Sequence, residues 1–152
     1  MNYNRYKKPF FKSLFWHQNK WHRHGVLVHT LKVMYHVAKA GRFDLLAAAM
    51  LHDIAKPLTA YHDAEDIKEG SKDYSFTNHE ELSYYLIKDW KWITKKTKDV
   101  VRYHYHIRGM AKAKEKGKVG KYNRYKREFI KLHPRLKYDL AFFMKCDDKG
   151  KK

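Results

Sequence analysis

The sequence predicts an all-α protein, a compact bundle of five to seven helices in a single domain over residues 1–152. Runs rich in leucine and alanine alternate with polar turns, a pattern typical of helices. The chain has only 7 Gly and 3 Pro, few turn-forming residues for a sandwich or a barrel. A length of 152 residues can bury one core and gives no reason to expect a second domain.

Each helix has its own local signal. The apolar spacing and punctuation of the chain predict helices at 25–40, 43–55, 77–92, 95–107 and from 134 onward. The second helix should stop near Lys56, because Pro57 disfavours helical backbone in the residue before it. The third should start at Thr77, which with Glu80 three residues later forms a capping box. Residues 58–76 are expected to be a polar loop, and 112–121 a mobile linker rich in lysine and glycine.

The charge is strongly positive and unevenly distributed. Lys and Arg number 34 against 16 acids, a net charge of +18, which favours polyanionic partners such as nucleotides or nucleic acid. The excess lies in residues 1–24 and 108–137, expected to decorate the domain, and both contain the pentapeptide Tyr-Asn-Arg-Tyr-Lys. Basic and aromatic residues together suit phosphate contact and base stacking, as in single-stranded nucleic-acid binding. The alternative is a solvated lysine-rich surface with a chance repeat.

Cysteine usage and hydropathy indicate the compartment. A single cysteine, Cys146, excludes an intramolecular disulfide and is simplest in a reducing environment. Neither a signal peptide nor a run able to span a bilayer is recognisable. The expected location is therefore cytoplasmic, with no membrane partner.

Ionisable residues interrupt the apolar pattern at a few positions. His52 and Asp53 close the run 45–51, which is apolar on all sides and therefore reads as a buried helix. Buried ionisable groups are unfavourable without a partner, and a divalent cation suits neutral imidazole and ionised carboxylate. His29, His79 and Asp147 complete a set whose spacing fits metal ligands.

Helical spacing selects among neighbouring candidates. His104 lies on the side of the buried Val100 and Val101, whereas His106 lies well round the axis. Likewise Asp147 continues the apolar stripe of the last helix and should point inward, leaving Asp148 at the surface. The alternatives are an inert buried polar network for the four best candidates and, for His79 and His104, ordinary core histidines.

These residues resemble the HD-domain metal-dependent phosphohydrolases. The resemblance runs from His29-Thr30 through His52-Asp53-Ile54-Ala55-Lys56-Pro57 and Asn78-His79-Glu80 to the segment 145–150. The segment 52–57 looks like HD modules that accompany tRNA nucleotidyltransferases and those of several nucleotide phosphodiesterases. It implies an HD-type helical fold.

The resemblance also implies roles for the residues. A first metal would be held by His29, His52, Asp53 and Asp147, and in two-metal members Asp53 bridges to a second ion. His79 and His104 match the second site, although the later histidine pair is usually adjacent and here is His104-Tyr105-His106.

Lys56 lies at the site in the family, and here it could reach the phosphate or the departing charge. Its other interpretation is a cation that stabilises a helix C-terminus. Glu80 is already explained as a cap and is not assigned as a general base.

The expected activity is hydrolysis of phosphate esters of nucleotides by a metal-activated water, with Asp53 and Lys56 as the catalytic residues. The ligand types suit one or two ions of Mn, Fe, Co, Ni or Zn. Two alternatives remain: a phosphodiesterase or phosphatase acting on RNA ends or single-stranded nucleic acid, and a nucleic-acid-binding protein with a structural metal.

Overall fold

The computed structural model describes residues 18, 22, 24–61, 68, 70 and 75–152, and the N-terminal basic segment 1–24 therefore lies almost wholly outside the described residues. The elements in chain order are α2 (Val26–Lys39), the 3-10 helix η2 (Phe43–Leu45), α3 (Leu46–Leu51), α4 (Lys56–Thr59), β1 (Ala60–Tyr61), β2 (Ser75–Phe76), α6 (His79–Ile87), α7 (Lys95–Tyr103), α8 (His106–Glu115), α9 (Val119–Ile130) and α10 (Pro134–Gly150). Six of the described helices have nine or more residues, which confirms the predicted helical bundle.

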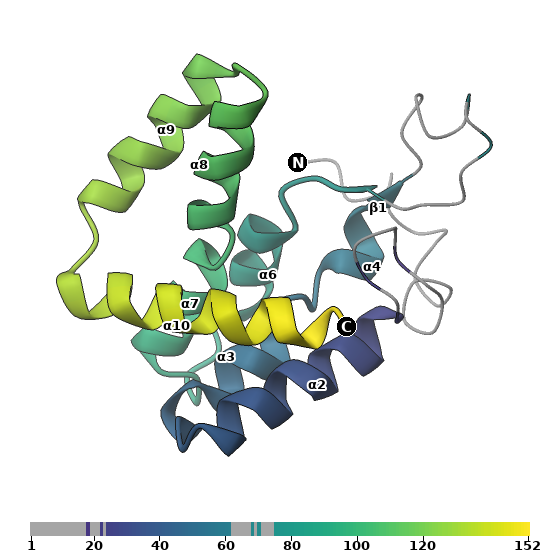
Figure 1. Cartoon of the computed structure of the whole chain (residues 1–152). Coiled ribbons are helices and arrows are strands. Elements are labelled where there is room, and N and C mark those ends of the chain that lie inside the picture. Colours follow the sequence, from purple (N-terminus) through teal and green to yellow (C-terminus); the bar gives the residue numbers. More distant parts are fainter. Residues whose placement is uncertain (1–17, 19–21, 23, 62–67, 69, 71–74) are drawn as a thin grey trace.

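The helices form a bundle from which one hairpin projects. Figure 1 shows α10 lying across α2, α3 and α7, while α8 and α9 pair and extend away from the rest. The C-terminal end of α10 lies against the middle of α2, where Gly150 meets Val33. Near the start of α10, Asp139 pairs with Arg42, which follows the C-terminal end of α2. The two helices therefore run antiparallel. In the described part of the chain, no helix combines the length and apolar character needed to cross a membrane.

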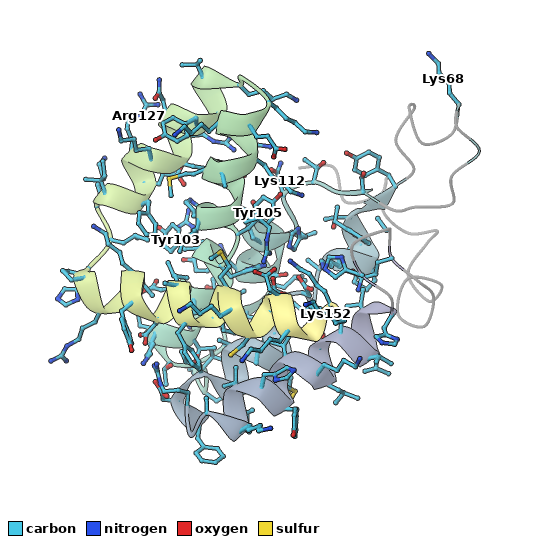
Figure 2. All side chains as sticks on the ribbon, viewed as in Figure 1. Lys68, Tyr103, Tyr105, Lys112, Arg127 and Lys152 are labelled. Carbon is cyan, nitrogen blue, oxygen red and sulfur yellow. The ribbon has the colours of Figure 1, made fainter. Side chains whose placement is uncertain are left out.

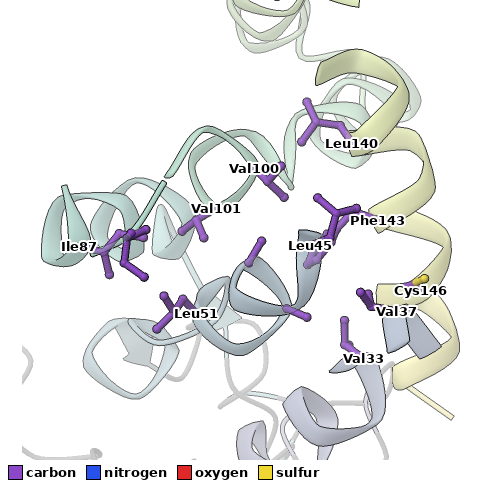
Figure 3. Packing of buried hydrophobic residues seen from close by; sticks show 13 residues of the cluster. Val33, Val37, Leu45, Leu51, Ile87, Val100, Val101, Leu140, Phe143 and Cys146 are labelled. Carbon is purple, nitrogen blue, oxygen red and sulfur yellow. The ribbon is translucent and has the colours of Figure 1, made fainter. Parts of the chain in front are cut away.

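The hydrophobic core lies where α2, α3, α7 and α10 meet. Its buried members come from all four helices and include Val37, Leu45, Val100, Leu140 and Phe143, each fully buried (Figure 3). Apolar burial of this kind is the main favourable contribution to folding. The core also sets the position of the polar groups discussed below, because Phe143 contacts two histidine rings edge-on.

The expected helix 43–55 is wrong in its second half. The helix α3 ends at Leu51, and residues 52–55 form a turn in which the Lys56 amide donates to the Asp53 carbonyl. Lys56 then begins the short helix α4, with Pro57 in its first turn. Proline is tolerated there because first-turn amides have no partner within the helix. Lys56 therefore lies in the single turn of α4 and not at the end of the predicted helix 43–55.

The expected capping box at Thr77 is not formed. The helix α6 begins at His79, and its N-cap is Asn78, in the left-handed region at φ 58° without a side-chain capping bond. The Thr77 hydroxyl instead lies 2.7 Å from the Tyr61 hydroxyl across the short β1–β2 pair. Glu80 is thus free of a capping role, and α6 ends at Ile87 rather than near residue 92.

The expected helix 95–107 and linker 112–121 also differ from the structure. The helix α7 ends at Tyr103, and a turn at 104–105 leads into α8. Residues 112–115 are the last turn of α8, and α9 starts at Val119 after a tight turn at Gly117, whose φ is 63°. The Lys/Gly-rich segment is therefore the end of one helix, a tight turn and the start of the next helix.

Candidate metal centre

Asp53 lies at the centre of a buried polar cluster and presents its two carboxylate oxygens to different histidines. Its Oδ2 is 3.4 Å from His29 Nε2 and 3.2 Å from His52 Nε2. Its Oδ1 is 3.3 Å from His79 Nε2 and 3.8 Å from His104 Nε2. All five residues are at most 6% exposed. The carboxylate therefore stands between two pairs of imidazoles.

Asp147 joins the first of these pairs from the last helix. Its Oδ1 is 2.9 Å from His29 Nε2 and 3.6 Å from His52 Nε2. Two groups with the spacing of metal ligands result, His29 with His52 and Asp53, and Asp53 with His79 and His104. The structure thus brings together all six residues that the sequence analysis proposed as ligands, from segments as distant as α2 and α10.

Backbone carbonyls orient three of the four histidines. The Nδ1 atoms of His52, His79 and His104 lie 2.8, 3.0 and 2.7 Å from the carbonyl oxygens of Ala49, Phe76 and Val101. A carbonyl oxygen only accepts, so each Nδ1 carries a hydrogen, and Nε2 is the ring nitrogen that faces Asp53. Metal-binding histidines commonly use this outer-shell contact to fix their tautomer.

Several atoms of the cluster are buried without a hydrogen bond of acceptable geometry. Among the described residues these include both ring nitrogens of His29, Nε2 of His52 and both oxygens of Asp53. Buried polar atoms nearly always have partners, so a group of orphans at one point requires an explanation. A divalent cation satisfies neutral imidazole and carboxylate together, and the donor set fits that ligand.

Positive charge keeps the carboxylates ionised. Burial alone would raise the pKa of Asp53, but the charges of His52 and Lys56 hold it well below its usual range. The pKa of Asp147 is likewise low despite burial, because His29 and His52 contact it and Arg108 adds its charge. Burial opposes a charged His52, yet Asp53 and Asp147 raise its pKa to about 9.

Two other imidazoles are held neutral. Burial, then the charges of His52 and His79, lowers the pKa of His104 far below its usual value. Burial also lowers the pKa of His22 to about 2, with Lys56 and His29 adding to the effect. His104 is therefore available as a neutral donor at physiological pH.

Lys56 belongs to the cluster. Its Nζ lies 2.7 Å from Asp53 Oδ2 and donates to Gln18 Oε1 at 3.1 Å. Gln18 is fully buried, although it belongs to the segment expected to be a surface decoration. A buried ammonium beside the central carboxylate supplies fixed positive charge at the site.

Sequence reasoning missed two further residues at the site. Arg108 on α8 places Nη1 2.7 Å from Asp147 Oδ2. Its position four residues after His104 was an available signal, since residues four apart share a helix face, although a turn interrupts this one. His22 packs its ring edge-on against His29 with centroids 5.1 Å apart.

The discarded neighbours lie outside the cluster. The Nε2 atom of His106 lies 2.6 Å from Glu128 on α9, so this ring faces α9 and not the cluster. Asp148 is exposed and pairs with Arg108 and Lys151. Both results agree with the helical-face argument made from the sequence.

The sequence matches the HD domain family over residues 26–134. The match contains five of the six clustered residues, and Asp147 lies beyond its end. Searches of curated proteins and of solved structures found no significant match. Membership suggests metal-dependent phosphohydrolase activity, and the His/Asp clusters could hold a metal. Because the match covers more than half of the chain, this protein belongs to the HD domain family.

Proposed function

We propose that this protein is a metal-dependent phosphohydrolase that cleaves phosphate esters of nucleotides. The observation that carries the proposal is that the two carboxylate oxygens of Asp53 face different histidines. Oδ2 faces His29 and His52, and Oδ1 faces His79 and His104. A carboxylate shared in this way is suited to bridging two ions. We assign the first ion to His29, His52, Asp53 and Asp147, and the second to Asp53, His79 and His104.

The metal would lower the pKa of a bound water and polarise the phosphoryl group, which is the chemistry that an unreactive phosphate ester needs. The protein contributes positive charge on both sides of the carboxylates, from Lys56 at Asp53 and Arg108 at Asp147. Lys56 is placed to donate to a phosphoryl oxygen or to the leaving oxygen as negative charge develops. Asp53 and Lys56 are therefore the residues to which we assign catalytic roles.

The donor set also bears on the cofactor and on the setting. Four imidazoles with two carboxylates favour Mn, Fe, Co, Ni or Zn over magnesium, which prefers oxygen ligands and retained water. Nucleotides carry the negative charge that a chain of net charge +18 attracts. The single cysteine supports a cytoplasmic protein.

The test is hydrolysis of nucleoside mono- and triphosphates, cyclic nucleotides and an RNA with a 2′,3′-cyclic phosphate end, in manganese. Asp147→Asn and Asp148→Asn form a matched pair, because they make the same change at adjacent positions, one in the cluster and one at the surface. We expect turnover in the parent and in Asp148→Asn, and loss of turnover in Asp147→Asn and Asp53→Asn. Tight metal binding without turnover of any substrate would instead indicate a structural metal in a nucleic-acid-binding protein.

A further inference from the structure

The projecting hairpin of α8 and α9 carries a large positive charge. Residues 106–130 contain nine Lys or Arg and only two acids, Glu115 and Glu128. The carboxylate of Glu128 is held by its contact with His106. The hairpin is also well packed, because Tyr125 lies so close to Gly109 that an added Cβ would be 2.8 Å from its ring. Its charges are therefore displayed on a defined scaffold.

One line of these charges leads away from the metal centre. Arg108 and Lys112 are four residues apart in α8, the spacing of residues on one helix face, and Lys116 follows four residues later at the C-cap of the helix. We call these three residues the basic row. Arg108 contacts Asp147, so the row begins at the cluster. In Figure 2, Lys112 and Tyr105 project from the side of α8 that faces the centre of the molecule, whereas Arg127 lies on the opposite side of the hairpin.

Helix geometry directs the row back toward the site. Side chains on a helix lean toward its N-terminus, and the N-terminus of α8 is the end nearest the cluster. Tyr105, at that end, packs against His79 with ring centroids 5.8 Å apart. The side chain of Lys112 is therefore directed along α8 toward the end that lies at the cluster.

The outer part of the row has little compensating charge. Arg108 and Lys151 are matched by Asp147 and Asp148. Neither Lys112 nor Lys116 forms an ion pair with any residue that the structure describes. The pKa of Lys112 is lowered, first by desolvation and then by the neighbouring charges of Arg108, Lys151 and Lys116, which outweigh the opposite effect of Glu115. An anion placed here would relieve this repulsion.

We propose that the basic row binds consecutive phosphates of a single-stranded nucleic acid whose terminal nucleotide enters the metal centre. This substrate class rests on the proposed function for the chemistry at the centre, whereas binding along the row does not. The row spans eight residues, about 12 Å of helix. That length exceeds what one terminal phosphate requires, since phosphates follow one another about every 3.4 Å of axis in a DNA strand.

The burial of the site selects a single strand. Asp53 and Asp147 are 2% and 4% exposed, so the scissile ester must reach a recessed point. The end of a single strand can enter such a site, whereas a continuous duplex or a flat membrane surface cannot. A single line of basic residues that begins at the Asp147 contact of Arg108 fits one strand of phosphates.

The test is the salt dependence of binding to a labelled oligouridylate with a hydrolysis-resistant phosphorothioate end, using the metal-loaded full chain. The variant Lys112→Gln/Lys116→Gln removes the outer row. The control Arg127→Gln/Lys131→Gln removes the same charge from another face of the hairpin. It matches the row variant because these two residues are also four apart. Each lost phosphate contact should lower the slope of log affinity against log salt by about 0.7 for a single strand. We expect a decrease of about 1.4 in the row variant and almost none in the control.

The results separate the row from the chemistry, because binding is measured without turnover. Equal weakening by both variants would show a diffuse field rather than a row and would overturn the proposal. So would undetectable binding in the parent, or a row variant that loses affinity for anionic phosphatidylserine vesicles but not for the oligonucleotide. A parent that binds through the row yet hydrolyses nothing would refute the proposed function alone.

Discussion

Arg108 and Asp147 form an ion pair across two helices, with Nη1 of the first 2.7 Å from Oδ2 of the second. The other oxygen of Asp147 faces His29. One carboxylate is thus divided between a permanent cation of the protein and the cluster to which we assign a metal. Arg108 is a positioning residue in this arrangement, because it fixes which oxygen Asp147 turns toward the histidines.

Replacing Arg108 with Gln should destabilise the metal-free protein more than the metal-loaded one. The side chains of Arg108 and Asp147 are 18% and 6% exposed, and breaking such a pair leaves a buried carboxylate less compensated, at a cost of about 3 kcal/mol. A bound cation would replace part of the lost charge. Urea unfolding in chelator and in manganese measures the difference.

Arg102→Gln is the matched control. Arg102 pairs with Glu81 at the surface, where both side chains are more than a third exposed. Its loss should cost less than about 1 kcal/mol with or without metal. Equal losses at Arg102 and Arg108 would contradict the positioning role of Arg108.

The number of metal ions bound should follow from the two oxygens of Asp53, each of which faces one pair of histidines. We expect the parent to bind two ions, His29→Gln and His79→Gln to bind one each, and Asp53→Asn to lose both with high affinity. The control is His106→Gln, because His106 is close to His104 in sequence but its ring contacts Glu128. This variant should retain two ions. Elemental analysis after gel filtration gives the count. A parent with one ion that His79→Gln leaves in place would contradict the second site.

The sequence predicted α2 and α10 well because their apolar faces alternate with polar ones, whereas it did not predict α9. The helix α10 begins at Pro134 as expected, and its inward stripe ends at Asp147 as the periodicity indicated. Periodicity did not reveal the break after Leu51, where residues 52–55 form a turn. That turn matters for the site, because it directs His52 and Asp53 toward the same point.

Contacts between distant segments could not be predicted from the sequence. Gln18 has no local signal, and the spacing of Arg108 from His104 does not reveal its partner, since Gln18 and Arg108 contact residues far along the chain, Lys56 and Asp147. The capping box at Thr77 failed for a related reason. Tertiary contact with Tyr61 provides the threonine hydroxyl with another partner, and a left-handed Asn78 takes the cap position.

Metal-free stability should fall as pH rises from neutrality. The folded pKa of His52 is raised to about 9 from an ordinary value of 6.5, so its contribution is complete below pH 6.5 and disappears as pH passes through about 9. The low pKa values of Asp53 and Asp147 give contributions that are lost only in acid, and neutral His104 titrates outside this window. Between pH 6.5 and 8.5 the free energy of unfolding should fall by about 2 kcal/mol.

Urea unfolding in chelator at several pH values tests this slope. His52→Asn should remove it, because the titrating group is gone. Saturating manganese should also reduce it, since a cation that needs the neutral imidazole replaces the proton. A stability that stays level from pH 6.5 to 8.5 in the metal-free parent would show that Asp53 and Asp147 do not hold a proton on His52.

The last prediction concerns the close approach of α10 to α2. At Gly150 a Cβ would lie 2.6 Å from Val33 Cγ2 and 3.3 Å from both Nδ1 and the carbonyl oxygen of His29. Gly150→Ala must therefore push α10 away from α2, with an overpacking cost of about 1–3 kcal/mol. Because Asp147 is one turn earlier on α10, the shift should lengthen its contact with His29 and weaken metal binding at the first site, with less effect on the second. Gly120→Ala, where an added Cβ meets nothing within 4 Å, is the control and should stabilise α9 by about 0.5–1 kcal/mol. Calorimetric titration with manganese compares the two variants; an unchanged first-site affinity in Gly150→Ala would mean that the glycine serves helix packing without setting the ligand geometry.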